Sequence, residues 1–125
     1  MKRICVRWFG VVLGMPMWAG FTFGLAMLSP AYAITESTDT IRAIMLYEGG
    51  NLVYVYPTNG VVNPPACHVG NGNYYSFSMS RPMAKSYLAA LLTAQAMGSK
   101  VQFVGAGACI DQSISDTLQY FVILK

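Results

Sequence analysis

The sequence predicts a mainly β domain with one helix (α+β), closed as a five-stranded Greek-key barrel. The first observation behind this prediction is that a single stretch, residues 80–98, has the composition of a helix. The second is the order of the remaining segments, since three strand-like stretches precede that helix and two follow it. The third is that residues 51–56 are apolar or aromatic on both faces, which suits a strand inside a closed barrel better than an edge of a flat sheet.

Residues 1–33 have the pattern of a secretory signal. A basic head is followed by the apolar run 8–28 and by Ala31-Tyr32-Ala33, whose small residues suit a signal peptidase. We expect cleavage after Ala33, a mature domain of residues 34–125, a secreted or periplasmic location and no membrane association after cleavage. The alternative is a membrane anchor, because about twenty apolar residues can span a bilayer. Pro16, four glycines and the adjoining cleavage site favour the signal.

The basic character of the whole chain comes from this leader. Three of the eight Lys and Arg residues fall within residues 1–33 and none of the five acidic residues does, so the net charge of +3 becomes zero in residues 34–125. Nucleic-acid binding needs clustered Lys or Arg to neutralise phosphates. The sequence therefore argues against a nucleic-acid partner.

Two cysteines remain after the leader, Cys67 and Cys109. In a small exported domain they most simply form one disulfide. From the entropy of closing the loop, such a bond contributes about 4 kcal/mol to the free energy of unfolding. A metal pair or a reactive thiol is the alternative, and His68 lies beside Cys67. Because the chain has only this histidine and no second ligand pair, we expect no metal.

The segments before the helix predict a hairpin and a third strand. Residues 41–47 and 51–56 are strand-like and flank Glu48-Gly49-Gly50, a short glycine turn. Residues 34–40 are polar and are expected to be a mobile terminus, while 57–73 are rich in Pro, Gly and Asn and are expected to be loop. Residues 74–79 then alternate as the third strand.

The helix is expected to begin at Ser80 as cap, with Pro82 in its first turn, and to end at Gly98. Its apolar face should comprise two rows of residues, namely Met83, Tyr87 and Leu91 and, beside them, Ala84, Leu88 and Leu92. Residues 100–104 and 119–124 are the last strands, separated by a polar loop at 110–118. The resulting order, β-β-β-α-β-β, is that of an OB-like barrel plugged by its helix. A ferredoxin-like fold would need a helix after the first strand, and a plain sandwich would leave the helix without a face to cover.

The sequence offers little for catalysis. Acyl transfer needs a nucleophile beside a base, and the single histidine, His68, is expected to be a solvated loop residue. Asp111 and Asp116 share one loop and are expected to serve turns and caps rather than a glycosidase pair. We therefore expect no enzyme activity and no cofactor, with a small hydrolase as the third hypothesis.

A binding surface is the better prediction. The strands are rich in tyrosine and the loops in uncharged amides and hydroxyls, the mixture with which proteins meet the C–H faces and hydroxyls of sugars. The alternative is that these tyrosines are barrel core and these loops are turns. The candidate binding residues are Tyr54, Tyr56, Asn59, Asn73, Tyr74, Asp111, Gln112 and Ser113.

The passage Y-L-A-A-L-L-T-A-Q-A-M-G-S-K-V-Q-F at 87–103 and the motif G-A-G-A-C at 105–109 resemble a known family. This is the family of small secreted OB-fold B-subunit-like proteins, which includes the binding subunits of subtilase-cytotoxin-like and pertussis-like AB5 toxins and uncharacterised bacterial relatives. The resemblance implies a homopentamer that binds host glycans, with helix residues Arg81, Lys85 and Gln95 at oligomer contacts. The alternative function is a periplasmic or secreted protein of the cell envelope that binds or inhibits another protein.

Overall fold

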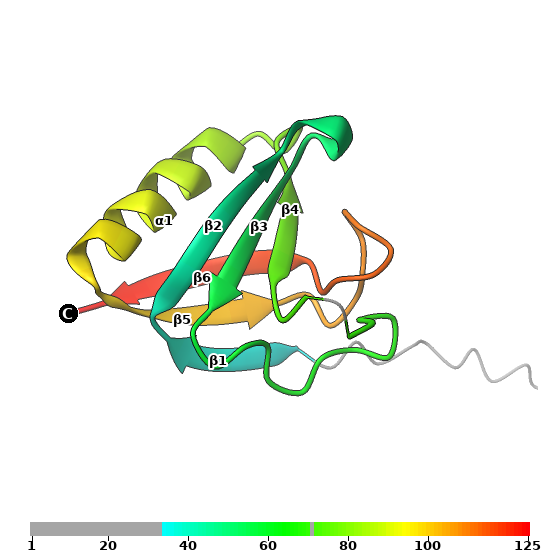
Figure 1. Cartoon of the computed structure of the whole chain (residues 1–125), viewed down its shortest axis with the longest axis horizontal. Helices are drawn as coiled ribbons and strands as arrows, with labels where there is room; N and C mark the ends of the chain where they lie inside the picture. Colours follow the sequence, from blue (N-terminus) through cyan, green and yellow to red (C-terminus); the bar gives the residue numbers. More distant parts are fainter. Residues whose placement is uncertain (1–33, 71) are drawn as a thin grey trace, which may run out of the picture.

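The computed structural model describes residues 34–70 and 72–125, which form six strands and one α-helix (Figure 1). The elements are β1 Thr35–Asp39, β2 Ile41–Tyr47, a 3-10 turn at Glu48–Gly50, β3 Leu52–Pro57, β4 Tyr75–Ser78, α1 Ala84–Met97, β5 Lys100–Gly105 and β6 Leu118–Leu124. The predicted signal at residues 1–33 lies outside the described residues.

The strands form two three-stranded antiparallel sheets, β1-β5-β6 and β2-β3-β4, whose strands run in different directions in Figure 1. The predicted five-stranded closed barrel is therefore wrong. The described residues form six strands, in the order β-β-β-β-α-β-β, and the two sheets do not close on each other: between them lies one isolated β-bridge, from Ser76 of β4 to Thr117 just before β6.

The two apolar faces of β3 have a different cause from barrel closure. Val53 and Val55 point into the main core between the sheets, where both are fully buried. Leu52 and Tyr54 point to the other side and pack with Tyr74 in a second apolar cluster. Strand alternation thus serves two separate clusters, so burial on both faces does not require a barrel.

Strand β1 was not expected, because its sequence T-E-S-T-D is polar. It pairs antiparallel with β5, and Thr35 turns inward, where it is buried and its hydroxyl donates to Asp116. Only Thr40 separates β1 from β2, so the chain passes almost directly from one sheet into the other. Long-range pairing and one buried polar contact, rather than local propensity, define this strand.

The predicted apolar face of the helix is partly wrong. Met83 and Leu92 are 59% and 46% exposed, whereas Leu91 and the small residues Ala84 and Ala94 are buried. Tyr87 and Leu88 pack against the same core, which is completed by apolar and aromatic side chains from both sheets: Ile41, Val53, Val55, Tyr75, Phe77, Val101, Phe103 and Leu118. The contact stripe therefore runs along Ala84, Tyr87, Leu88, Leu91 and Ala94, which leaves Met83 and Leu92 outside it.

The helix ends where expected and begins later than expected. Gly98 adopts a left-handed conformation (φ 63°) and its amide caps the last turn, as glycine does at this position. At the other end, Ser80 accepts a hydrogen bond from the Asn51 side chain (2.8 Å) and residues 79–83 form turns before the helix. The predicted Ser80 cap is therefore wrong, because the hydroxyl is used by a residue distant in sequence.

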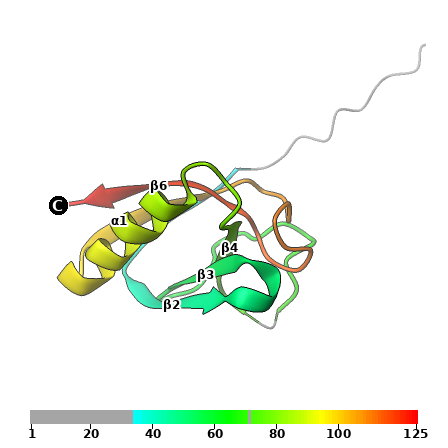
Figure 2. The ribbon, with the colours of Figure 1, turned by 90° about the horizontal axis from the view of Figure 1, so that it is seen from above.

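Side chains of α1 reach both sheets, and the view from above shows the course of the helix relative to the strands (Figure 2). The Tyr87 hydroxyl donates to the Gln119 carbonyl of β6 (3.1 Å), and the Gln95 amide donates to the Arg42 carbonyl of β2 (3.4 Å). Just before the helix, Arg81 forms an ion pair with Asp111 (2.8 Å) and donates to the Leu118 carbonyl (2.7 Å). Arg81, which the resemblance placed at an oligomer contact, is engaged within the chain.

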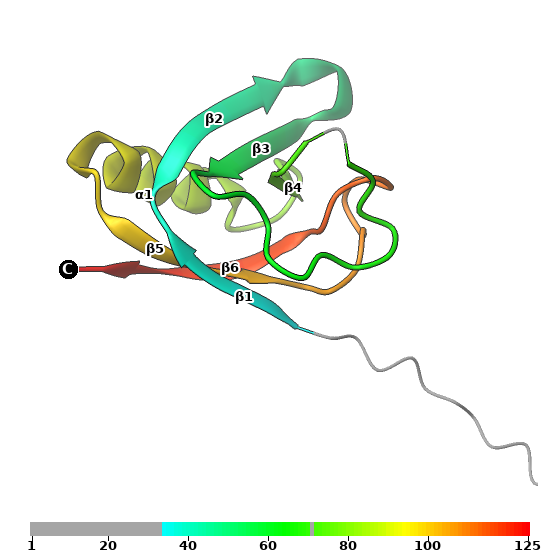
Figure 3. The ribbon, with the colours of Figure 1, turned by 60° about the horizontal axis from the view of Figure 1, so that its bottom comes forward.

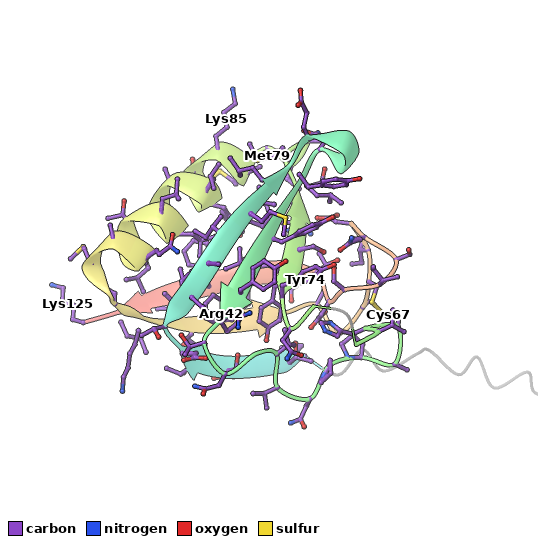
Figure 4. All side chains as sticks on the ribbon, viewed as in Figure 1. Arg42, Cys67, Tyr74, Met79, Lys85 and Lys125 are labelled. Atoms are coloured by element: carbon purple, nitrogen blue, oxygen red, sulfur yellow. A yellow bond between two sulfur atoms is a disulfide. The ribbon has the colours of Figure 1, made fainter. Side chains whose placement is uncertain are left out.

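We predict that Arg81→Ala lowers the free energy of unfolding by about 1–2 kcal/mol, because Asp111 and the Leu118 carbonyl each lose a charged donor. Lys85→Ala is the matched control, since Lys85 is exposed and extends away from the molecule in Figure 4. The control should change stability by less than about 0.5 kcal/mol. Urea denaturation of both variants measures the difference, and equal losses would refute the internal role of Arg81.

Candidate binding site

Four tyrosine rings form a continuous row on the face of the β2-β3-β4 sheet that points away from the main core. The ring centroids of Tyr47 and Tyr54 are 5.9 Å apart, those of Tyr54 and Tyr74 4.6 Å, and those of Tyr56 and Tyr74 5.1 Å. Tyr54 and Tyr74 are 7% and 8% exposed, whereas Tyr47 is 49% exposed and Tyr56 is half-buried. We call these four residues the tyrosine surface; its centre is packed and its two ends are accessible.

Arg42 places a cation at one end of this surface. The β2-β3 register shifts between Ile41 and Ala43, and such an irregularity turns a side chain out of the regular alternation. The Arg42 guanidinium carbon lies 5.7 Å from the centre of the Tyr56 ring, within cation–π range. Burial and the neighbouring Tyr74 raise the pKa of Tyr56 and Arg42 opposes them, so the phenol is neutral at physiological pH.

The centre of the surface is fixed by hydrogen bonds from the loop before β6. Gln112 donates from Nε2 to the Tyr54 hydroxyl (3.0 Å), and its Oε1 accepts from the buried Ser115 hydroxyl (2.6 Å). Ser115 also lies 2.6 Å from the Ser76 hydroxyl of β4. Burial, followed by the effects of Tyr74 and Tyr47, raises the pKa of Tyr54. The Tyr54 ring is therefore held in place and uncharged.

Two loops frame this site, one described over residues 61–70 and 72–74 and the other over residues 106–117, and they run side by side in Figure 3. We call them the disulfide loops, because the predicted bond between Cys67 and Cys109 is confirmed, with a Cα–Cα distance of 6.1 Å. The Val69 amide also donates to the Ile114 carbonyl (3.1 Å). One loop delivers Tyr74 (Figure 4) and the other delivers Gln112, so their junction determines the geometry of the tyrosine surface.

The disulfide indicates an oxidising, extracytoplasmic location. Across residues 34–70 and 72–125, no helix combines the length and apolarity needed to cross a bilayer.

A buried polar group lies behind the disulfide loops. The Asp116 carboxylate is fully buried and accepts hydrogen bonds from the Thr35 hydroxyl (2.5 Å) and the Ala108 amide (3.2 Å). The Asp116 amide donates to Nδ1 of His68 (3.1 Å). A side chain at Gly105 would meet both the Asp116 carboxylate and the Thr35 hydroxyl at about 2 Å, so only glycine leaves room for this pair. Burial raises the pKa of the Asp116 carboxyl, against the lowering effect of these hydrogen bonds.

We predict that Asp116→Asn removes a pH dependence of stability. Because the folded-state pKa of Asp116 is raised, the wild-type fold is most favoured below the ordinary pKa of an aspartate and loses stability as the pH rises through the raised value. Asparagine can accept from the Ala108 amide and donate to the Thr35 hydroxyl without charge. The free energy of unfolding of the wild type minus that of the variant should therefore fall as the pH rises above about 4, the ordinary pKa of an aspartate. Urea titrations across this range measure it, and a flat or rising difference would contradict the burial of a charge.

The structure brings together four of the eight candidate binding residues: Tyr54, Tyr56, Tyr74 and Gln112. Asn73 is exposed beside Tyr74 and lies against Gly60, where an added Cβ would come within 2.9 Å of it. It therefore borders the tyrosine surface.

The other three candidates lie elsewhere or have structural partners. Asn59 donates to the Asp39 carboxylate through its amide (2.5 Å) and its side chain (3.1 Å). Asp111 accepts from Arg81 and from the Ser78 amide (2.8 Å), so its carboxylate holds the loop on β4. Ser113 is exposed in the loop before β6.

Sequence reasoning missed Arg42 and left Tyr47 out of the site, although Tyr47 follows the same alternation as the other strand tyrosines. The bulge that presents Arg42 has no local sequence signal. His68 was expected to be a solvated loop residue, and this is wrong, because its Nε2 atom is buried and its Nδ1 atom accepts the Asp116 amide.

The tyrosine surface, packed at its centre and accessible at Tyr47 and Tyr56, is suited to binding a ligand. Among the described residues, no group of three or more His, Cys, Asp or Glu side chains is placed to hold a metal ion. Comparisons with protein-family models, curated proteins and solved structures find no match to the chain.

Proposed function

We propose that this protein is an exported, non-enzymatic module that binds carbohydrate through the tyrosine surface. The observation that carries the proposal is the continuous row of four tyrosine rings, packed at its centre and accessible at Tyr47 and Tyr56. A preordered row reduces the conformational entropy lost on binding, because Tyr54 and Tyr74 are already immobilised.

The chemistry of the surroundings supports a sugar ligand. Aromatic faces cover the C–H patches of a sugar ring, while phenol hydroxyls and amides meet its hydroxyls. The Arg42 guanidinium supplies donors beside the Tyr56 ring, and Asn73, which precedes Tyr74 in the chain, is exposed. The resemblance to toxin binding subunits supports a host glycan as the ligand and a homopentamer as the assembly, and both belong to the proposal.

A glycan array tests the proposal with the purified protein and a double variant, Tyr47→Ala/Tyr56→Ala. Each ring contributes about 0.5–1.5 kcal/mol in aromatic contacts, so the double variant should bind its best glycan roughly tenfold more weakly or worse. Tyr120→Ala is the matched control, because Tyr120 is 47% exposed, close to the 49% of Tyr47, and lies on β6 in the other sheet. Equal binding by the double variant, or an equal loss in the control, would refute the tyrosine surface as the site. Native mass spectrometry of the same sample reports whether the assembly is pentameric.

A second candidate function is binding of an envelope protein. It is favoured by a cavity of about 350 Å³ between the β2-β3 turn and α1, lined by Leu46, Tyr47, Glu48, Asn51, Leu52, Met79 and Leu88. Leu46 is 63% exposed, and Leu92, one turn along the helix from Leu88, is 46% exposed. Leu46→Glu should then abolish recovery of a stoichiometric protein partner from envelope extract and leave glycan binding unchanged. Recovery of the same partner by this variant would exclude the cavity as its docking site.

A further inference from the structure

Among residues 34–70 and 72–125, one disulfide and two hydrogen bonds join the disulfide loops to each other, and one of these three bonds depends on a titratable group. The disulfide between Cys67 and Cys109 is covalent, and the bond from the Val69 amide to the Ile114 carbonyl joins two backbones. The third is the hydrogen bond from the Asp116 amide to Nδ1 of His68. His68 therefore holds the one contact of the three that changes with protonation.

The direction of that hydrogen bond defines the state of the ring. Nδ1 can accept the Asp116 amide only when it carries no proton, so the imidazole is neutral and its proton lies on Nε2. The Nε2 atom is buried and has no hydrogen-bond partner among the described residues. An imidazolium carries protons on both nitrogens. Its Nδ1–H group would face the N–H group of Asp116, and two donors cannot form a hydrogen bond with each other. The protonated ring cannot keep this contact.

The groups that face His68 and Asp116 do not restore it. The Asp116 carboxylate accepts from Thr35 of β1 and from the Ala108 amide, and its charge attracts a protonated His68, but it does not replace Nδ1 as the acceptor of the Asp116 amide. The Tyr74 ring, just before β4, lies near His68, with the ring centroids 6.5 Å apart and the planes tilted by 53°. Tyr75 of β4 points its hydroxyl toward Ser37 of β1 (3.3 Å), and its pKa is raised by burial and further by Asp116. Protonation of His68 thus leaves the buried Asp116 amide without its acceptor.

We propose that His68 is a pH-sensitive latch on the tyrosine surface. The neutral ring holds the disulfide loops together; the protonated ring releases the Asp116 amide, loosening Tyr74 on one loop and Gln112 on the other. The disulfide keeps the loops tethered while the latch is open, so closure is reversible. The consequence for ligand affinity rests on the proposed function, whereas the latch itself does not.

A pH titration followed by NMR tests the latch on the isotope-labelled wild-type protein without any ligand. Because His68 is the only histidine in the chain, its ring signals are assigned without ambiguity. As the ring gains its proton, the Asp116 amide and the Tyr74 ring signals should move in the same transition. The protection of the Asp116 amide, that is, how much more slowly it exchanges than an unprotected amide at the same pH, should fall about five- to tenfold, as expected for the loss of one hydrogen bond. An Asp116 amide and Tyr74 ring that stay unchanged through the titration of His68 would overturn the proposal.

Two variants separate the latch from other titrations. In His68→Asn the side-chain oxygen can replace Nδ1 as acceptor without titrating, so the Tyr74 signals should become independent of pH in this range. Signal changes caused by titration of the Asp116 carboxyl persist in this variant. They can therefore be told apart from the changes caused by His68. In His68→Ala the Asp116 amide should show the lower protection, relative to an unprotected amide at the same pH, across the whole titration. If His68→Asn keeps the wild-type transition at Tyr74, the latch is refuted. If the latch titrates as described and no glycan binds, the proposed function fails and the latch stands.

Discussion

Replacing Cys67 and Cys109 together by alanine is expected to lower the free energy of unfolding by about 4 kcal/mol. The two residues are 42 positions apart, so the bond removes much of the freedom of the unfolded chain. The loss is large for a domain of this size, whose total stability is typically about 5–15 kcal/mol. Urea denaturation monitored by circular dichroism measures it.

Reduction of the wild-type disulfide by a thiol reagent should reproduce the effect of the double variant, which separates loss of the bond from loss of the side chains. The Tyr54 and Tyr74 environments should also become more mobile, because Gln112 and Tyr74 lie on the disulfide loops. A double variant within about 1 kcal/mol of the wild type would show that the hydrogen bonds between the loops suffice without the covalent link.

Tyr74→Ala is expected to lower the free energy of unfolding by about 3 kcal/mol, near the lower end of the range for removing a buried aromatic ring. The ring is 8% exposed and packs on Tyr54, Tyr56 and His68. Its removal opens a cavity in the second apolar cluster and separates the two ends of the tyrosine surface. Urea denaturation gives the energy, and near-ultraviolet circular dichroism reports the lost ring packing.

Tyr74→Phe is the matched control. Phenylalanine keeps the ring that packs on Tyr54 and Tyr56 and removes only the hydroxyl, so this variant should differ from the wild type by less than about 0.5 kcal/mol. A Tyr74→Ala variant as stable as Tyr74→Phe would mean that the row of rings is not a packed unit. The tyrosine surface would then lack the preorganisation on which its proposed role depends.

The parts of the fold that were predicted correctly have local causes. The β2-β3 hairpin follows from two strand-like runs around a glycine turn, and β2 has the predicted bounds of Ile41–Tyr47. The helix ends at Gly98 because a left-handed residue is needed there. The disulfide follows from two cysteines in an exported domain.

The errors arise where distant residues meet. β1 is a strand because it pairs with β5 and because Thr35 reaches Asp116, neither of which has a local signal. The closed barrel was inferred from the two apolar faces of β3, which instead pack into two separate clusters. Ser80 was expected to cap the helix, but Asn51 binds its hydroxyl.

The candidate site was predictable to a similar degree. The tyrosines of β3 were found because alternation places Tyr54 and Tyr56 on one face. Asn59 and Asp111 were chosen by residue type alone, and their partners, Asp39 and Arg81, lie 20 and 30 positions away. Arg42 depends on a bulge, and His68 depends on the fold that buries its Nε2 atom.

The most direct test of the central claim is to map a bound glycan by NMR chemical-shift changes, using the best ligand from the array. If the tyrosine surface is the site, the largest changes will fall on the side-chain signals of Tyr47, Tyr56 and Arg42, with the Tyr120 ring unchanged. Changes centred on Tyr120, or on Leu88 and Met79 in the cavity beside α1, would contradict the account. So would the absence of any glycan that binds.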